Sequence, residues 1–338
     1  MADLRARQSR WAVTPDAEAH LRATVPAGWT LHVVEGLTSA DGDGGKTPST
    51  EVLAAIAGAE VYFGFGLPKP LFAAAKRLKW VHSAAAGVGS MLFPEMLESE
   101  IVITNSAGVH AVPIAEQSLA GILALLRGVD IARELQRNRR WSRETFLGPE
   151  SPVREVGGLR ALILGAGGLG SALGARLSAL GVRCTGVRRR VERGIPAGFE
   201  RVVGPDDWRA LLPETDIVAL CAPSTPETKA LVGAAELDRL PRGAIIVNVA
   251  RGALLDENAM AARIRDGALR GAVLDVFSEE PLPESSPLWD LPSVIMTPHV
   301  SGVTDHFWER EMALFVENWQ AYDRGKPMRN VVDPKAGY

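Results

Sequence analysis

The segment Gly165-Ala166-Gly167-Gly168-Leu169-Gly170 decides the fold of this chain. It follows a short apolar run, 161–164, and leads into a helical stretch that ends before a further apolar run from Val182. In a β-α-β unit, such glycines permit a tight turn, a close approach of the backbone to a pyrophosphate, and close helix–strand packing. The pattern G-x-G-x-x-G in this context predicts dinucleotide binding at a helix N-terminus, with a purely structural glycine turn as the alternative.

The runs around this segment have the spacing of a doubly wound sheet. Apolar, β-branched runs of strand length occur at 161–164, 182–187, 217–221, 245–249, 272–276 and 294–297. The first hundred residues repeat the alternation, with expected strands at 31–34, 61–63, 80–82 and 101–104 and helices at 51–57 and 70–77. Strands that alternate with helices pair in parallel. We therefore predict an α/β protein of two Rossmann-like or flavodoxin-like domains, with doubly wound parallel sheets and a cleft between the domains.

Two helical stretches set the expected domain boundaries. Residues 113–140 carry one long helical pattern, which could bridge the domains or pack against a second subunit. A last helix, 307–324, follows the final strand and is expected to return to the first domain. The predicted division is 1–108 with 303–338 for a discontinuous substrate-binding domain, and 109–302 for an inserted dinucleotide-binding domain.

Composition excludes several classes of protein. The 338 residues carry 37 Lys and Arg against 40 Asp and Glu, a formal net charge of −3, without the basic excess typical of nucleic-acid binding. No apolar run is long enough to cross a bilayer, and two cysteines are too few for a disulfide framework. The loop 41–46 resembles a calcium site, but Gly45 and Val52 stand where ligands are required. We expect a cytoplasmic protein without a metal, a nucleic-acid partner or a membrane partner.

Cofactor specificity is indicated by the end of the strand 182–187. An NAD-binding unit places an acidic residue there, about 20 residues after the glycines, to accept a hydrogen bond from the ribose 2′-hydroxyl. This strand is followed by Arg188, Arg189 and Arg190, and the first acid is Glu192. Guanidinium groups pair with a 2′-phosphate, which a carboxylate would repel. The sequence therefore favours NADP(H), with NAD(H) possible; a solvated run of arginines is the structural alternative.

Three titratable residues follow the ends of predicted strands. They are Arg251, Glu280 and His299, and ligands of open α/β sheets bind at this edge. Arginine can hold a carboxylate or polarise a carbonyl, histidine can exchange a hydroxyl proton near neutral pH, and glutamate can orient the histidine ring. Each residue alone would more often be structural. Their combination indicates a site for a keto acid.

The chain resembles the D-isomer-specific 2-hydroxyacid dehydrogenase family over about residues 80–319. The matching segments are TNSAGVHAVPIAEQSLAGILALLR, LGAGGLGSALG, CAPSTPETKALV, NVARGALLDENAM, AVLDVFSEEPLP and TPHVSG. The resemblance implies that Arg251 binds the substrate and takes part in catalysis, and that Glu280 supports His299 as the general acid/base. It also implies cofactor contacts, beyond the glycine segment and the arginines, for Pro223, Thr228, Val249, Ala250, Asp275 and Gly302.

The substrate end of the pattern departs from the family. Members usually have a loop like G-A-G-x-D whose backbone amides hold the substrate carboxylate. Here residues 84–90 read AAAGVGS, so Gly87 and Val88 are the expected binding residues, but Gly89 replaces the usual Asp. Further pocket candidates are Trp141, His306, Phe307 and Trp308.

The resemblance implies reversible hydride transfer between a nicotinamide and C2 of a short 2-oxo acid. The arginines after the strand resemble members that use NADPH, including glyoxylate and hydroxypyruvate reductases. Family likeness also implies a homodimer. The alternatives are a catalytically weak, NAD(P)-sensing interaction protein of the same fold, and a formate-type dehydrogenase, in which the glutamate at the position of Glu280 is replaced.

Overall fold

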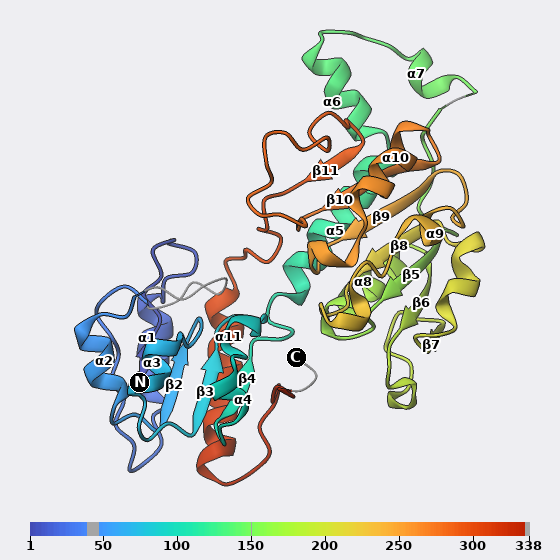
Figure 1. Cartoon of the computed structure of the whole chain (residues 1–338). Helices are drawn as coiled ribbons and strands as arrows, with labels where there is room; N and C mark the ends of the chain where they lie inside the picture. Colours follow the sequence, from blue (N-terminus) through green and yellow to red (C-terminus); the bar gives the residue numbers. More distant parts are fainter. Residues whose placement is uncertain (39–46, 150, 335–338) are drawn as a thin grey trace. The chain divides into compact units, whose positions relative to one another are not determined.

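A computed structural model describes residues 1–38, 47–149 and 151–334 of the chain (Figure 1). The calcium-like loop 41–46 lies outside the described residues. The chain divides into two compact units, Met1–His110 with Val303–Tyr338, and Ala111–Gly302. Each unit is described by itself below.

The unit Ala111–Gly302 contains a parallel sheet of seven strands in the order β11-β10-β9-β8-β5-β6-β7. The order reverses between β5 and β8, which makes the sheet doubly wound and confirms the predicted fold class. The short, half-exposed β7 was not expected from the sequence. The strands are β5 (Arg160–Leu164), β6 (Arg183–Val187), β7 (Arg201–Val203), β8 (Ile217–Leu220), β9 (Ala244–Asn248), β10 (Leu269–Leu274) and β11 (Val294–Met296).

Helices cover both faces of this sheet because successive strand residues point to opposite sides. Ile163 packs with α5 and α8 on one face, whereas Leu162 and Leu164 pack with α9, α10 and η3 on the other. The α-helices are α5 (Ala111–Leu126), α6 (Val129–Arg137), α7 (Glu144–Leu147), α8 (Gly168–Ala179), α9 (Ala234–Leu237) and α10 (Glu257–Arg265). The 3-10 helices are η2 (Val191–Arg193), η3 (Trp208–Glu214), η4 (Pro226–Thr228) and η5 (Gly252–Leu254).

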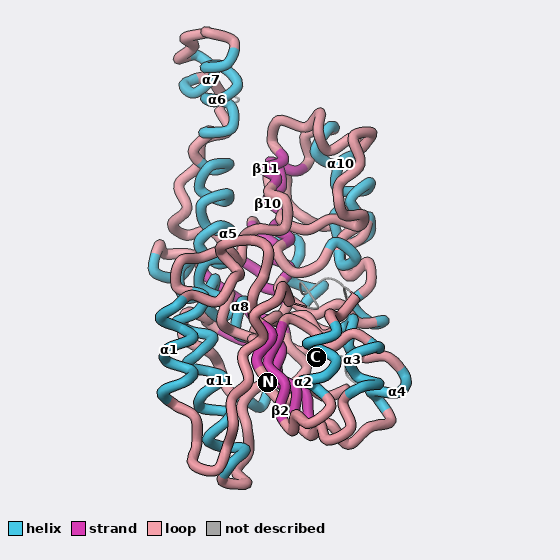
Figure 2. Tube along the Cα trace, turned by 90° about the vertical axis from the view of Figure 1, so that its left-hand side faces the viewer, coloured by secondary structure: helices cyan, strands magenta, loops and turns pink. Residues whose placement is uncertain are grey.

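The prediction of one long helix over 113–140 is wrong. The helix breaks at Gly128, whose φ of 67° is left-handed, and α5 and α6 are bent by 70°. Arg270 stabilises the break, since its guanidinium pairs with both carboxylate oxygens of Asp130 at 2.6 and 2.9 Å and donates to Leu125 O at 2.7 Å. Figures 1 and 2 show α6 and α7 standing away from the sheet of their own unit. Within the described ranges no single helix passes as a membrane span, although the bent pair passes together by length and composition.

The other unit has a parallel sheet in the order β1-β2-β3-β4. The predicted strand at 31–34 is reduced to one bridge, between Val33 and Ala2, and the first strand lies instead at the start of the chain. The strands are β1 (Ala2–Asp3), β2 (Val61–Gly64), β3 (Trp80–Ser83) and β4 (Val102–Asn105). The helices are α1 (Pro15–Ala23), α2 (Thr50–Ile56), α3 (Lys69–Ala74), η1 (Gly89–Met91), α4 (Pro94–Leu97) and α11 (Phe307–Asp323).

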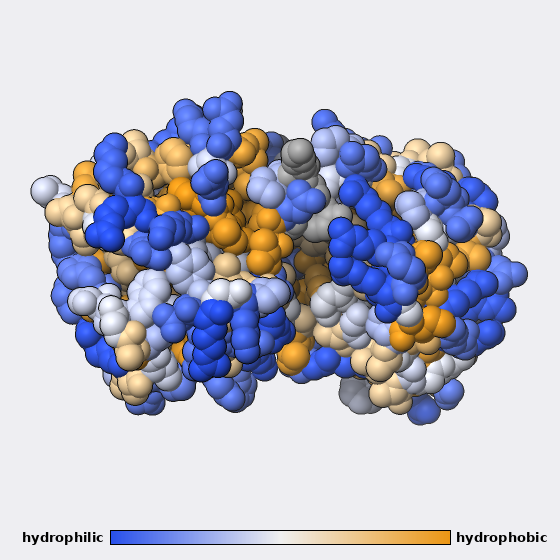
Figure 3. All heavy atoms as spheres, turned by 90° about the horizontal axis from the view of Figure 1, so that it is seen from below, coloured by the Kyte–Doolittle hydropathy of each residue, from blue (hydrophilic) through white to orange (hydrophobic). Residues whose placement is uncertain are grey.

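Helix α11 returns the end of the chain to this unit, next to α1 (Figure 2). Phe315 stacks on Phe63 with ring centroids 4.0 Å apart and on Trp80 at 5.4 Å. Buried aromatic pairs of this kind contribute more than their buried area alone. On the face drawn in Figure 3, polar residues surround separate apolar patches.

Candidate active site

The glycine-rich segment forms the turn between β5 and α8. Gly165 has a φ of +111°, and a Cβ there would lie 2.6 Å from the backbone of Cys221, so only glycine fits. A Cβ at Gly170 would lie 2.1 Å from Gly165 O. The absence of a side chain at Gly170 therefore permits the close packing of the helix against the end of the strand. A Cβ at Gly167 would meet nothing within 4 Å. The turn therefore packs tightly against the protein backbone at Gly165 and Gly170 and faces open space at Gly167.

Helix α8 begins at Gly168 without a side-chain cap at Gly167. Amides in the first turn of a helix lack partners inside the helix, and with the helix dipole they favour a bound anion. Leu169 lies in this first turn, and the beginning of α8 thus offers donors beside open space. This arrangement fits the pyrophosphate of a dinucleotide.

The arginines after β6 lie in a largely exposed loop, and of the three only Arg188 is half-buried. The Nη2 atom of Arg188 donates to Gly194 O, while its buried Nε has no hydrogen-bond partner among the described residues. Arg189 pairs with Glu227 of η4, with 3.3 Å between Nη2 and Oε2. The Thr225 hydroxyl donates to the same carboxylate and, with Arg189, lowers the pKa of Glu227. This loop holds cations where a 2′-phosphate is expected, with Glu227 as a competing acceptor that the sequence did not reveal.

The remaining cofactor candidates lie in loops after β8, β9, β10 and β11. Thr228 Oγ1 donates to Pro223 O at 2.8 Å, which closes the loop after β8. Val249 and Ala250 are buried directly after β9, and Gly302 ends this unit.

Arg251 lies at the exposed start of η5, and its Nη1 donates to Ala250 O at 2.7 Å. The next residue explains the position of this loop. A Cβ at Gly252 would lie 1.9 Å from the carbonyl carbon of Phe277, so the backbones of the two loops touch. Only glycine permits this approach, which brings the loop of Arg251 against the loop that carries Glu280.

Glu280 and His299 form a hydrogen-bonded pair across two neighbouring loops. Oε2 of Glu280 lies 2.7 Å from Nδ1 of His299, and Oε1 accepts from Phe277 N at 2.8 Å. Both side chains are about one-third exposed, so the pair is open to a ligand. A carboxylate at Nδ1 fixes the ring and leaves Nε2 for proton exchange. No described residue bonds to that nitrogen.

His299 has a left-handed backbone, with a φ of 53°, which is uncommon outside glycine. Asp275 holds it there. Its backbone carbonyl accepts from His299 N at 2.8 Å, and its buried carboxylate accepts from the Thr297 hydroxyl at 2.6 Å, from Val300 N at 2.9 Å and from both the amide and hydroxyl of Ser301. Both carboxylate oxygens of Asp275 thus bind the loop 297–301, an interaction that its motif did not reveal.

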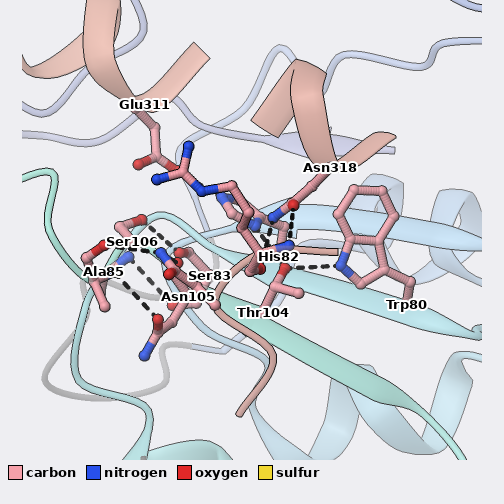
Figure 4. A network of polar contacts seen from close by, with 12 residues as sticks. Trp80, His82, Ser83, Ala85, Thr104, Asn105, Ser106, Glu311 and Asn318 are labelled. Carbon is pink, nitrogen blue, oxygen red and sulfur yellow. Dashed lines mark hydrogen bonds and ion pairs between the residues drawn. The ribbon is translucent and has the colours of Figure 1, made fainter. Parts of the chain in front are cut away.

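The expected carboxylate-binding residues belong to the other unit. Gly87 and Val88 follow β3, and the Val88 side chain is buried in the core. A buried network supports the strand (Figure 4): Trp80 Nε1 donates to Thr104 Oγ1 at 2.8 Å, and His82 lies between Thr104 and Glu311 of α11, at 2.7 and 3.0 Å. This network has no local signal in the sequence, because its members are far apart along the chain.

The other pocket candidates have different surroundings. Trp141 is 92% exposed, and His306 is exposed and pairs with Glu309. Phe307 and Trp308 are buried in the core of the first unit, where Phe307 stacks on His110 at 5.2 Å. Their packing in this core is sufficient to explain why both positions are aromatic.

A doubly wound sheet with an open glycine turn, and a histidine–glutamate pair in the loops after β10 and β11 of the same sheet, are typical of a dinucleotide-dependent oxidoreductase. A model of the D-isomer specific 2-hydroxyacid dehydrogenase, NAD binding domain, matches residues 119–301. Glyoxylate/hydroxypyruvate reductase A of Salmonella heidelberg is 33% identical over 280 residues, which cover 78% of this chain and 83% of that protein. The chain belongs to the D-isomer specific 2-hydroxyacid dehydrogenase family, and it is an NAD(P)-dependent enzyme.

Solved structures agree with this assignment. A family protein from Aeromonas salmonicida has a TM-score of 0.78 and 28% identity, covering 94% of this chain and 96% of that one. A D-isomer specific 2-hydroxyacid dehydrogenase from Xanthobacter autotrophicus, in complex with NADPH and MES, has a TM-score of 0.77 and 29% identity, with 98% of both chains covered. The fold of the whole chain is therefore that of the family.

Proposed function

We propose that this enzyme uses NADPH to reduce a short 2-oxo acid of the glyoxylate or hydroxypyruvate type to the 2-hydroxy acid. The observation that carries the proposal is the contact between His299 Nδ1 and Glu280 Oε2, at 2.7 Å. It leaves Nε2 of a protonated His299 to donate to a carbonyl oxygen. The reductase name of the Salmonella relative and the NADPH in the Xanthobacter structure support the choice of substrate and cofactor.

Each residue then has a defined task. When bound, the nicotinamide would supply the hydride for C2 of the substrate. His299 gives the proton from Nε2 to the oxygen on which negative charge develops, and Glu280 holds the ring and balances the imidazolium. Arg251 binds the substrate carboxylate or polarises the carbonyl, together with the amides of Gly87 and Val88. The reverse reaction uses the same groups, with neutral His299 as the base.

The cofactor is held by the unit Ala111–Gly302, and the other unit carries the substrate loop. The amides that begin α8 bind the pyrophosphate, and the guanidinium groups of Arg188 and Arg189 bind the 2′-phosphate. Val249, Ala250 and Gly302 contribute backbone to the nicotinamide side, and Pro223 and Thr228 to the adenosine side.

A homodimer is part of this proposal. Its support is the segment around α6 and α7, where Val129, Trp141 and Leu147 are 46, 92 and 72% exposed. Large apolar side chains with such exposure are typical of interaction surfaces. Light scattering during gel filtration gives the mass, and a monomer at micromolar concentration would contradict the dimer. We also propose a cytoplasmic location, where both cysteines stay reduced, and cell fractionation tests it.

Loss of NADPH absorbance with a panel of 2-oxo acids tests the proposed reaction. We expect turnover with the small acids, and loss of most turnover in His299→Ala with NADPH affinity retained. His32→Ala is the matched control because His32 is also an exposed histidine beside a glutamate. A wild-type enzyme without activity on any 2-oxo acid, or normal turnover in His299→Ala, contradicts the proposal.

A further inference from the structure

The loop after β3 is held in place by hydrogen bonds that its carbonyl oxygens accept (Figure 4). Ser106 Oγ donates to Ser83 O at 2.7 Å, and Ser106 N donates to Ala85 O at 3.4 Å. The side chain of Asn105 reaches further, with its Nδ2 donating to Ala86 O at 2.8 Å. Residues at the end of β4 thus clamp the carbonyl side of the loop that follows the neighbouring strand.

The amide side of the same loop is left for a ligand. Ala84 N donates to Gly64 O, and Ala85 N donates to the Ser83 hydroxyl. Among the described hydrogen bonds, none is donated by the amides of residues 86–88. Backbone N–H groups that are partly shielded from water need a partner. Gly87 is half-buried, so a substrate carboxylate would supply the partner that no described residue supplies.

Asn105 is itself fixed in one orientation. Its Oδ1 accepts from Ala107 N at 3.1 Å, so its Nδ2 must face Ala86 O. Asn330, near the end of the chain, donates from Nδ2 to Asn105 O at 3.0 Å, and Asn105 N donates to Asn330 O at 3.2 Å. The C-terminal segment therefore holds Asn105 in place along β4, next to the bridge between Thr104 and Val331.

We propose that Asn105 is a positioning residue for the substrate carboxylate. Its amide holds Ala86 O away from the ligand, so that the following N–H groups converge on the substrate. This inference rests on the proposed role of Gly87 and Val88. Asn105 needs no contact with the substrate, and it has no role in binding the cofactor.

Two substitutions of Asn105 distinguish a role in positioning the substrate loop from a role limited to the turn with Ala107. Asn105→Ser keeps a side-chain oxygen for Ala107 N, because serine forms a similar though weaker turn, but it cannot reach Ala86 O. Asn105→Asp keeps the acceptor and replaces the donor by a second oxygen, which repels Ala86 O. A role limited to the turn predicts nearly normal kinetics in both variants. Asn258→Asp adds the same charge at an exposed site in α10 and serves as control.

The measurements are kcat, KM for glyoxylate, inhibition by oxamate, NADPH affinity by fluorescence, and Tm. We expect both variants to raise KM and the oxamate inhibition constant about tenfold, as for a lost charge-assisted hydrogen bond. The kcat, NADPH affinity and control variant should stay close to wild type. An unchanged KM, or equal losses in kcat and NADPH affinity, overturns the inference. Failure of the wild type to reduce 2-oxo acids or to bind oxamate overturns the proposed function and this inference with it.

Discussion

Asp275→Asn tests how the geometry of the site is maintained. The carboxylate accepts from Thr297, Val300 and Ser301, and the backbone carbonyl of Asp275 accepts from the amide of His299. Asparagine has the same shape but only one acceptor oxygen, so its NH2 group must face at least one donor of the loop. The loop 297–301 then loses part of the framework that holds His299 in its left-handed conformation.

The smaller loss occurs when the NH2 group replaces Oδ2. Ser301 N keeps a bond to Oδ1, at 3.1 Å, but its bond to Oδ2, at 3.0 Å, is lost, and the Ser301 hydroxyl must accept from the new NH2 group where it donated to the carboxylate. One lost charge-assisted bond with a buried donor costs about 2 kcal/mol. This cost lowers Tm by about 5 °C. A shift of His299 by about 1 Å would lower kcat about a hundredfold, since misplaced groups lose catalysis steeply.

The assay compares kcat, NADPH affinity and Tm. We expect Asp275→Asn to lose kcat and keep NADPH affinity within a factor of about two, less than the effect of one exposed ion pair. Asp256→Asn is the matched control, because Asp256 caps α10 by accepting from Ala259 N and asparagine caps helices equally well. Normal kcat with weakened NADPH binding would refute this reasoning. It would mean that Asp275 acts on the nicotinamide, the contact that the family resemblance implies.

Three further predictions concern the cofactor loop and the thiols. Gly167→Ala should keep the wild-type Tm, because its Cβ meets nothing within 4 Å, yet weaken NADPH binding measured by fluorescence titration; unchanged affinity would remove Gly167 from the site. Glu227→Gln should tighten NADPH binding about threefold, the value of an exposed ion pair, without an effect on NADH, because it releases Arg189. Equal effects on both cofactors would exclude competition with the 2′-phosphate. Burial raises the pKa of Cys184 and Cys221 to about 12, so a thiol reagent in mildly alkaline buffer should label neither until the protein is unfolded; rapid native labelling would contradict this.

The sequence predicted the elements whose signals are local. The strands β8 and β9 are buried along their whole length, and their sequences are mainly apolar and rich in β-branched residues. By contrast, β1 has only two residues and exists because Ala2 pairs with Phe63, 61 positions away. Gly128 inside a helical pattern costs about 1 kcal/mol and does not by itself end a helix. The bend there is held by hydrogen bonds from Arg270, which is distant along the chain.

The same distinction applies to the site. The glycine pattern could be interpreted from the sequence because its turn, helix and strand are contiguous. The sequence around Asp275 is compatible with a carboxylate that faces a ligand and with one that binds a neighbouring loop. Only the fold distinguishes these two roles. Asn105 carried no signal as a functional residue, since its partner Ala86 contributes only a backbone oxygen.

Asp275 and Asn105 illustrate one way in which parallel sheets hold active-site loops. Asp275 directly follows β10 and binds the loop after β11, and Asn105 ends β4 and binds the loop after β3. Neighbouring parallel strands end at the same edge, so a polar side chain at the end of one strand can hold the loop of the next. Each unit thus fixes its loop with a residue that carries no reacting group. Substitutions at these two positions should therefore affect different kinetic parameters. A substitution of Asp275 should alter kcat, because its loop carries the proton donor, and a substitution of Asn105 should alter KM, because its loop carries the carboxylate-binding amides.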